Sequence, residues 1–254
     1  MPTTIPTTTS STRPGSPSAG DAYFETDTKN YIIYDGANWR GYASEGFPVS
    51  STHSLAFDGT DDYVDISNAS GLLNSKTAFT ISFWYKTTAS SDAGRMVASG
   101  TASSNRINIS ISGTLLYFSG GNAYSINATQ PSVNTWNHVI AQRDGTNGAI
   151  YINGSTTAFA SGSGFPSTST SNQAENLSIG RIPFGTPGYF DGFIEEVAIF
   201  TRPLTEAERT SIYNNHIYNN PSALWLFNNN SNDFNGVYNA TLENGLGYST
   251  DHRP

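Results

Sequence analysis

The stretch LSIGRIPFGTPGYFDGFIEEVAIFTRPLTEAE, residues 177–208, decides the fold of this chain because it joins a predicted strand directly to a predicted short helix. Residues 190–200, FDGFIEEVAIF, are rich in aromatic and β-branched side chains, which is typical of a strand. Beyond Pro203, Thr205 and Glu208 have the spacing of a capping box, which marks the start of a helix. We expect this helix to turn the chain between two sheets.

Strand-like runs continue on both sides of this stretch, from residue 51 to the C-terminus. The clearest are SLAFDG, DYVDI, FTISFWYK, RINISI, LLYFSG, WNHVIAQRDG, AIYING and ALWLF. In FTISFWYK the alternation places Ile81, Phe83 and Tyr85 on one face and Ser82, Trp84 and Lys86 on the other. This pattern is typical of sheets that turn one face toward a core.

Two pairs of residues predict tight hairpins between these strands. Asp144-Gly145 and Asn153-Gly154 accept the positive φ that such reversals require. Trp84 and Trp136 lie in strand-like runs, although alternation alone leaves open which face each side chain occupies.

Composition supports one large β domain with an appendage. A single sandwich can reach roughly 200–250 residues, and this chain has 254. Its 14 Tyr, 14 Phe and 4 Trp supply a core, while the absence of cysteine excludes disulfides and thiolate metal sites. The net charge of −8 and the scattered basic residues argue against nucleic acid as a partner. Without an apolar run for a signal peptide or a membrane span, we expect folding in a cytosol and no membrane contact.

Taken in order, the strand-like segments resemble the laminin-G-like jelly-roll family of concanavalin-A-like sandwiches. Residues 54–66 (SLAFDGTDDYVDI) resemble its first strand and turn, and residues 78–86 (AFTISFWYK) its early aromatic strand. Residues 136–154 resemble its central hairpin, and residues 177–208 its closing strand and helix. The resemblance covers about four-fifths of the chain. It implies an all-β jelly-roll sandwich of two antiparallel sheets.

One segment departs from the family order. ALWLFNNNSNDFNG (223–236) with NATLENG (239–245) is similar to the opening strand and turn of many members, yet it stands at the C-terminus. A closed sandwich tolerates this rearrangement because the ends of its chain lie close together.

The N-terminal fifth has a different composition. Residues 1–20 are rich in Thr, Ser and Pro and predict an extended arm that only a partner could order. Residues 21–50 predict a small β-hairpin module and linker, and residues 51–254 the sandwich. Residues 13–42 resemble a segment of tail, fibre and head-decoration proteins of tailed bacteriophages.

This second resemblance implies a non-enzymatic protein of the virion surface, made in the cytoplasm of a bacterial host. We expect a capsid decoration or cement protein attached through its arm, with the major capsid protein, tail or head proteins and its own copies as partners. The alternative is a tail or head fibre whose sandwich binds the host's surface polysaccharide.

Candidate catalytic groups are weak in this sequence. Retaining glycosidases place two carboxyl groups about 5–5.5 Å apart, whereas the adjacent Glu195 and Glu196 would face opposite sides of a regular strand. The four histidines show no catalytic or zinc-binding spacing, and His138 is interpreted as a satisfied sheet residue. We therefore expect no catalytic residues.

Calcium is the one cofactor for which the sequence offers suitable ligands. Asp58, Asp61, Asp62 and Asp65 surround one turn, and carboxylate oxygens on a loop are ligands that Ca²⁺ prefers. The resemblance implies rim calcium sites, with Asp191 as a distant contributor. The alternative is that these residues serve the turn alone.

Aromatic side chains in loops are the candidates for stacking on sugars. They are Tyr124, Phe184, Tyr189 and Tyr248. The alternative interpretation is that they cover a sandwich edge or a partner subunit.

Overall fold

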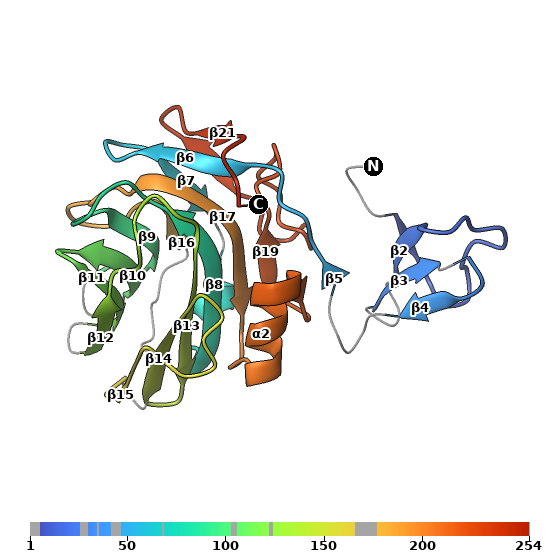
Figure 1. The fold of residues 1–254 in the computed structure, drawn as a ribbon, viewed down its shortest axis with the longest axis horizontal. Coiled ribbons are helices and arrows are strands. Elements are labelled where there is room, and N and C mark those ends of the chain that lie inside the picture. The colour runs from blue at the N-terminus through green and yellow to red at the C-terminus, as the bar shows by residue number, and fades with distance from the viewer. Residues whose placement is uncertain are drawn as a thin grey trace.

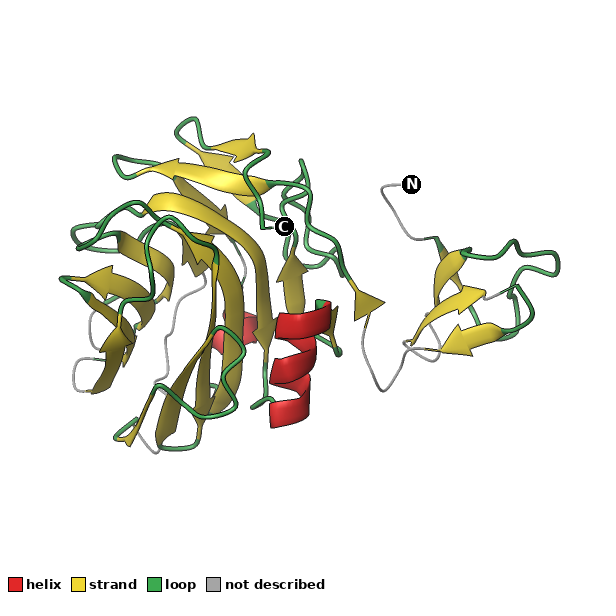
Figure 2. Ribbon diagram, in the orientation of Figure 1, coloured by secondary structure: helices red, strands yellow, loops and turns green. Residues whose placement is uncertain are grey.

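Two antiparallel sheets packed face to face form the body of the molecule (Figures 1 and 2). The structure is a computed structural model that describes residues 6–25, 30–34, 36–41, 47–67, 69–102, 106–121, 124–165 and 177–253. The all-β sandwich expected from the sequence is confirmed.

In spatial order, the seven-stranded sheet contains β12 (Tyr124–Thr129), β11 (Leu115–Gly120), β10 (Ile107–Ser112), β9 (Gly94–Ser99), β16 (Leu177–Ile179), β7 (Tyr63–Ile66) and β20 (Thr241–Glu243). The eight-stranded sheet contains β15 (Ala160–Ser163), β14 (Asn147–Ile152), β13 (Asn137–Asp144), β8 (Ala78–Lys86), β17 (Asp191–Phe200), β6 (Ser54–Asp58), β21 (Gly247–Ser249) and β19 (Ala223–Trp225). The described helices are α1 (Ser70–Leu73) and α2 (Glu206–Asn215), and β5 (Phe47–Pro48) pairs with β18 (Ile217–Tyr218).

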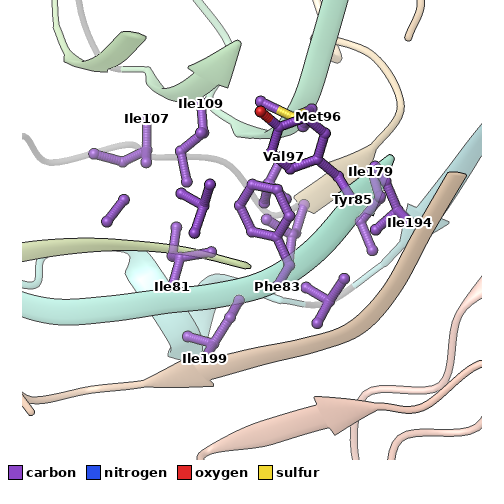
Figure 3. Packing of buried hydrophobic residues seen from close by; sticks show 14 of the residues in the cluster. Ile81, Phe83, Tyr85, Met96, Val97, Ile107, Ile109, Ile179, Ile194 and Ile199 are labelled. Carbon is purple, nitrogen blue, oxygen red and sulfur yellow. The ribbon is translucent and has the colours of Figure 1, made fainter. Parts of the chain in front are cut away.

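The core lies between the two sheets and follows the predicted alternation. Ile81, Phe83 and Tyr85 of β8 are fully buried and point toward the opposite sheet, Ile81 toward the isoleucines of β10 and the two rings toward Met96 and Val97 of β9 (Figure 3). Ile107 and Ile109 face them from the opposite sheet, because alternate residues of INISI point inward. The intervening polar residues of β10 therefore belong to the outer face of the seven-stranded sheet.

Strand β17 shares one edge between two partners. Its residues 191–194 pair with β6, and its residues 197–199 pair with β19. The register with β8 shifts between Glu195 and Ala198, and Glu196 has a φ of 50°, as in a β-bulge. The C-terminal strand β19 thus continues the sheet where β6 ends.

The two ends of the sandwich meet, as the closed fold requires. Asn228 Nδ2 donates to the Ser50 carbonyl at 2.7 Å, and Ser54 Oγ donates to the Asp251 carbonyl at 2.5 Å. This closeness permits the rearranged order that the sequence predicts for residues 223–245.

Helix α2 begins with the predicted capping box and covers the outer face of the eight-stranded sheet. Thr205 accepts from the Glu208 N–H, and the Glu208 carboxylate accepts from the Thr205 N–H at 2.9 Å. Tyr213 of this helix stacks on Trp84, with ring centroids 5.5 Å apart. Trp84 is therefore buried on the outer face under α2, whereas Trp136 is half-buried beside Phe193.

The described N-terminal residues form a small sheet of their own. Its strands are β1 (Thr7–Thr8), β2 (Ala22–Glu25), β3 (Asn30–Tyr34) and β4 (Trp39–Gly41), in that order. Residues 6–20 of the predicted arm are therefore not simply extended, because Thr7–Thr8 pairs in parallel with β2 and the Gly20 N–H donates to the Tyr34 carbonyl at 2.8 Å. Residues 26–29, which connect β2 to β3, and Asp35 lie outside the described residues.

No helix in the described part of the chain has the length and hydropathy needed to cross a bilayer.

Candidate functional site

The outer face of the seven-stranded sheet carries a row of small polar side chains. The register places Ser119 beside Asn108, Asn108 beside Ala98, and Ala98 beside Ser178. Each residue comes from a strand whose neighbouring positions point into the core. The row forms a polar floor that crosses β11, β10, β9 and β16.

Polar atoms of this floor are buried without being satisfied. Asn108 and Ser178 are 3% and 0% exposed, yet Asn108 Oδ1 and Ser178 Oγ have no hydrogen-bond partner among the described residues. Asn108 does use its Nδ2, which donates to Ser110 Oγ at 3.0 Å. Buried polar groups are almost always paired, so unpaired atoms gathered on one face need an explanation.

Longer side chains stand around this floor. Arg95 lies opposite Ser110 in the register, and Tyr117 lies on the other side of Ser110. The Arg181 guanidinium carbon is 3.4 Å from the centre of the Tyr63 ring. Aromatic rings beside amides and hydroxyls form a surface to which a polar, ring-shaped ligand can bind.

The loop after β16 packs against one of these arginines. The Arg95 N–H donates to the Gly188 carbonyl at 3.0 Å, and a Cβ on Gly188 would lie 3.6 Å from Arg95 Nε. Burial lowers the pKa of Arg95, and the charge of Arg106 lowers it further.

The predicted calcium residues partly come together at one rim. Carboxylate oxygens of Asp58, Asp61 and Asp62 lie within 4.8 Å of one another, while Asp65 and Asp191 are not in this group. Asp65 instead accepts from Ser67 Oγ at 2.9 Å. The Asp191 side chain packs against the Gly59 backbone, where an added Cβ would lie 3.0 Å from Asp191 Cβ.

Some carboxylate oxygens of these aspartates already accept hydrogen bonds within the turn. Asp58 Oδ1 accepts from the Thr60 N–H at 2.8 Å, and Asp62 Oδ2 accepts from the Asp58 N–H at 3.1 Å. The bond from the Thr60 N–H lowers the pKa of Asp58, whereas burial raises the pKa of Asp62 despite the bond that it accepts. The remaining oxygens of Asp58, Asp61 and Asp62 fit part of a calcium sphere, which takes six to eight oxygens in proteins.

The aromatic candidates for stacking on sugars differ in their surroundings. Tyr124 is 5% exposed, its hydroxyl donates to the Gly162 carbonyl at 2.8 Å, and its ring packs on Phe165. The expectation that Tyr124 is exposed is therefore wrong, because the strand pattern turns it into the core. Phe184 and Tyr189 are half-buried in the loop after β16, and Tyr248 is half-buried against the core.

Glu195 and Glu196 do not face opposite sides, contrary to the expectation from a regular strand. The bulge in β17 turns both carboxylates toward Arg253, whose Nε lies 3.0 Å from Glu195 Oε1 and whose Nη2 donates to Glu196. Both glutamates are fully buried. Burial and the nearby Glu196 raise the pKa of Glu195 to about 8.

Further contacts enclose this buried cluster. Ser51 Oγ donates to Glu195 at 3.0 Å, and the Tyr218 hydroxyl donates to Glu196 at 2.8 Å. His138 is 1% exposed and forms a 2.8 Å hydrogen bond with Ser82 Oγ, which confirms its interpretation as a satisfied sheet residue. The cluster joins β17, β18 and the C-terminal segment.

A groove of about 400 Å³ runs over the outer face of the eight-stranded sheet. Its lining is polar and comes from β13, β14 and β15, including Gln142, Asn147 and Ser161. Gln142 is already engaged, since its Oε1 accepts from the Leu204 N–H at 2.9 Å.

Comparison with known families shows the superfamily of the chain. Residues 58–208 match the Laminin_G_3 family, described as the concanavalin A-like lectin/glucanases superfamily. The chain belongs to this superfamily. No curated protein matches its sequence.

Solved structures of the superfamily's sandwich type share the fold at low identity. A putative carbohydrate binding protein from Bacteroides ovatus is 19% identical with a TM-score of 0.63, covering 93% of this chain and 71% of its own. A heptameric pentraxin from Limulus polyphemus is 13% identical with a TM-score of 0.62, covering 80% and 98%. Domain 4 of an arabinanase from Geobacillus stearothermophilus, in complex with arabinotriose, is 20% identical with a TM-score of 0.50, covering 63% and 76%.

Sequence reasoning missed the polar floor as a site. A signal for it exists in RINISI, where Asn108 and Ser110 alternate with isoleucines and Arg106 precedes them. Polar residues at outward positions normally meet water, so the pattern alone does not reveal that these are buried and unpaired.

Proposed function

We propose that the sandwich binds carbohydrate without cleaving it, on the outer face of its seven-stranded sheet. The observation that carries this proposal is the floor of buried, unpaired polar atoms, Asn108 Oδ1 and Ser178 Oγ. Both residues are almost completely buried, so a sugar would reach these atoms only when the side chains that cover them move aside. Its hydroxyls, which donate and accept, would then satisfy both atoms. Tyr63 and Tyr117 flank the floor and offer rings to the apolar faces of a sugar.

The comparisons support a carbohydrate ligand at the level of fold. The Bacteroides ovatus protein is described as a putative carbohydrate binding protein, and the arabinanase domain was solved with arabinotriose. A non-catalytic role is supported by the adjacent glutamates, which are buried on the other sheet and held by Arg253. A glycosidase needs its two carboxyl groups on either side of a bound sugar.

Calorimetric titration against a panel of neutral and acidic oligosaccharides tests this proposal. We expect Ser178→Ala to weaken binding while the melting temperature is retained, because the removed hydroxyl has no protein partner. Asn147→Ala in the groove of the other sheet is the matched control and should bind as the wild type does. Failure of the whole panel to bind, or a loss confined to Asn147→Ala, would contradict the proposal.

We further propose that the N-terminal sheet attaches the sandwich to a larger assembly, and that this assembly is a bacteriophage virion, as the resemblance of residues 13–42 implies. Two features support this role: β1–β4 pair only with one another, and β5 begins the pairing with the sandwich domain. Decoration of a capsid and presentation on a fibre both require such a separate attachment unit.

Particle binding tests the attachment. A chain that begins at residue 47 should keep the melting temperature of the full chain but lose co-sedimentation with particles that lack the protein. Equal sedimentation of the two forms would transfer attachment to the sandwich.

A further inference from the structure

Three arginines on the outer face of the seven-stranded sheet lack an acidic partner. Arg95, Arg106 and Arg181 take part in none of the ion pairs found among the described residues. The Nε atom of each is buried, and no hydrogen-bond partner for it is found in the described part of the chain. Partly buried guanidinium groups are normally paired, because removing a charge from water without compensation costs several kcal/mol.

The positions of these arginines converge on the polar floor. Arg95 lies opposite Ser110, and Arg106 immediately precedes β10, two residues before Asn108. Arg181 follows β16, just beyond the pairing of Ile179 with Val97. Burial lowers the pKa of Arg95, and the charge of Arg106 adds to this effect.

The overall charge makes this arrangement informative. The chain has 20 acidic and 12 basic residues, so carboxylates were available to pair with these arginines. Asp65 shares this face and lies opposite Ser178 in the register, where its carboxylate accepts from Ser67 Oγ and forms no ion pair with the three arginines. Among the described residues, the face therefore combines one carboxylate held by Ser67 with three arginines that lack an acidic partner, in a protein of net charge −8.

We propose that the saccharide bound on this face is anionic, with carboxylate or sulfate groups received by Arg95 and Arg106. The planar guanidinium fork matches both groups in a bidentate geometry. Arg181, stacked on Tyr63, would bound the same surface, while Asn108 and Ser178 would contact hydroxyls. This inference rests on the proposed function and adds the class of sugar.

Matched pairs of polysaccharide probes test the charge requirement. Polygalacturonate is compared with its methyl ester, and dextran sulfate with dextran, so each pair differs in the anionic group. We expect at least about tenfold tighter binding of the anionic member in one pair, weakening as salt rises. Which pair shows the difference distinguishes carboxylate from sulfate.

Variants assign the effect to the face. Arg95→Gln with Arg106→Gln should reduce anionic binding by about tenfold or more. Arg202→Gln removes a charge from an arginine already paired with Glu208 at 2.6 Å, and it should bind as the wild type does. Arg95→Lys keeps the charge but loses the fork, so it should bind with intermediate affinity. Melting temperatures check folding, and the single Arg95→Lys variant replaces the double variant if the latter does not fold.

The outcomes separate the two claims. Binding of neutral saccharides alone, lost in Ser178→Ala, would leave the proposed function intact and overturn the anionic class. Equal anionic binding by the double variant and the wild type would also overturn it. Absence of binding to every probe and to the oligosaccharide panel would overturn the proposed function itself.

Discussion

At the scale of single residues, Arg253 has the largest predicted effect on stability. Its guanidinium contacts both Glu195 and Glu196, which are fully buried at the gap between β6 and β19. Arg253→Leu leaves these carboxyl groups without a cation, and breaking a buried pair in this way costs about 3–5 kcal/mol. Urea unfolding measures the change. Arg202→Leu, at a pair that is more exposed, should cost about 1 kcal/mol or less, and equal losses would contradict the account.

The same cluster predicts how stability depends on pH. The pKa of Glu195 is raised from 4.5 to about 8, so the folded state keeps a proton that the unfolded state loses between these values. Its contribution to the free energy of unfolding is therefore fully present below pH 4.5 and is lost as the pH rises through 8.

His138 acts in the opposite direction at lower pH. Burial lowers its pKa from 6.5 to about 3, so the unfolded state takes up the additional proton and stability falls as the pH drops from 6.5 toward 3. Glu195 thus dominates between pH 6.5 and 8, where we expect stability to decline with rising pH. Urea unfolding of Glu195→Gln should show that decline removed, and an unchanged slope would contradict the assignment.

The two tryptophans form a matched comparison. Trp84 is 8% exposed and packs on His138 and Tyr213, so Trp84→Ala should cost about 3–5 kcal/mol. Trp136 is half-buried and donates from Nε1 to Asp251 at 3.3 Å, so Trp136→Ala should cost only about 1–2 kcal/mol. Chemical denaturation of both variants ranks them, and the reverse order would mean that the packing under α2 is misassigned.

At the scale of elements, the turn from Asp58 to Asp62 separates turn chemistry from calcium binding. The Asp58 carboxylate bonds backbone N–H groups of the turn, whereas the Asp61 carboxylate bonds none in the described residues. We expect Asp58→Ala to lower the melting temperature by about 2–4 °C even with chelator present. Asp61→Ala should leave the melting temperature in chelator unchanged.

Calcium titration completes this comparison. A bound ion would raise the melting temperature of the wild type, and Asp61→Ala would abolish that increase because it removes ligand oxygens only. Equal melting of both proteins with and without calcium would assign the three aspartates to the turn alone.

Some features of the strands and helices could be predicted from the sequence, and others could not. The alternation in β8 and the capping box of α2 are local patterns, so the inward residues and the start of the helix were predicted correctly. The bulge in β17 was not, because it depends on β6, β19 and Arg253, which are distant in sequence. The pairing of Thr7–Thr8 with β2 was missed for a similar reason, since a Thr-rich segment has little local preference for a strand edge.

At the scale of the whole molecule, the fold was predictable and the site was only partly so. The five predicted calcium aspartates divide into a cluster of three and the separate Asp65 and Asp191, and Tyr124 lies inside the core. The polar floor arises because β9, β10 and β16 become neighbours only in the folded sheet. The burial of these polar atoms without hydrogen-bond partners results from the assembled sheet and cannot be recognised in any single segment.

The central claim is that carbohydrate binds on the outer face of the seven-stranded sheet. An NMR titration of the 27.2 kDa chain tests this claim most directly. Oligogalacturonate is the probe, and its methyl ester is the neutral comparison. We predict that the largest shifts occur at the Asn108 side-chain amide, the Ser178 backbone amide and the Arg95 Nε–H, all on one face. Shifts concentrated at Asn147 and Ser161 in the opposite groove, or no shifts with either saccharide, would contradict it.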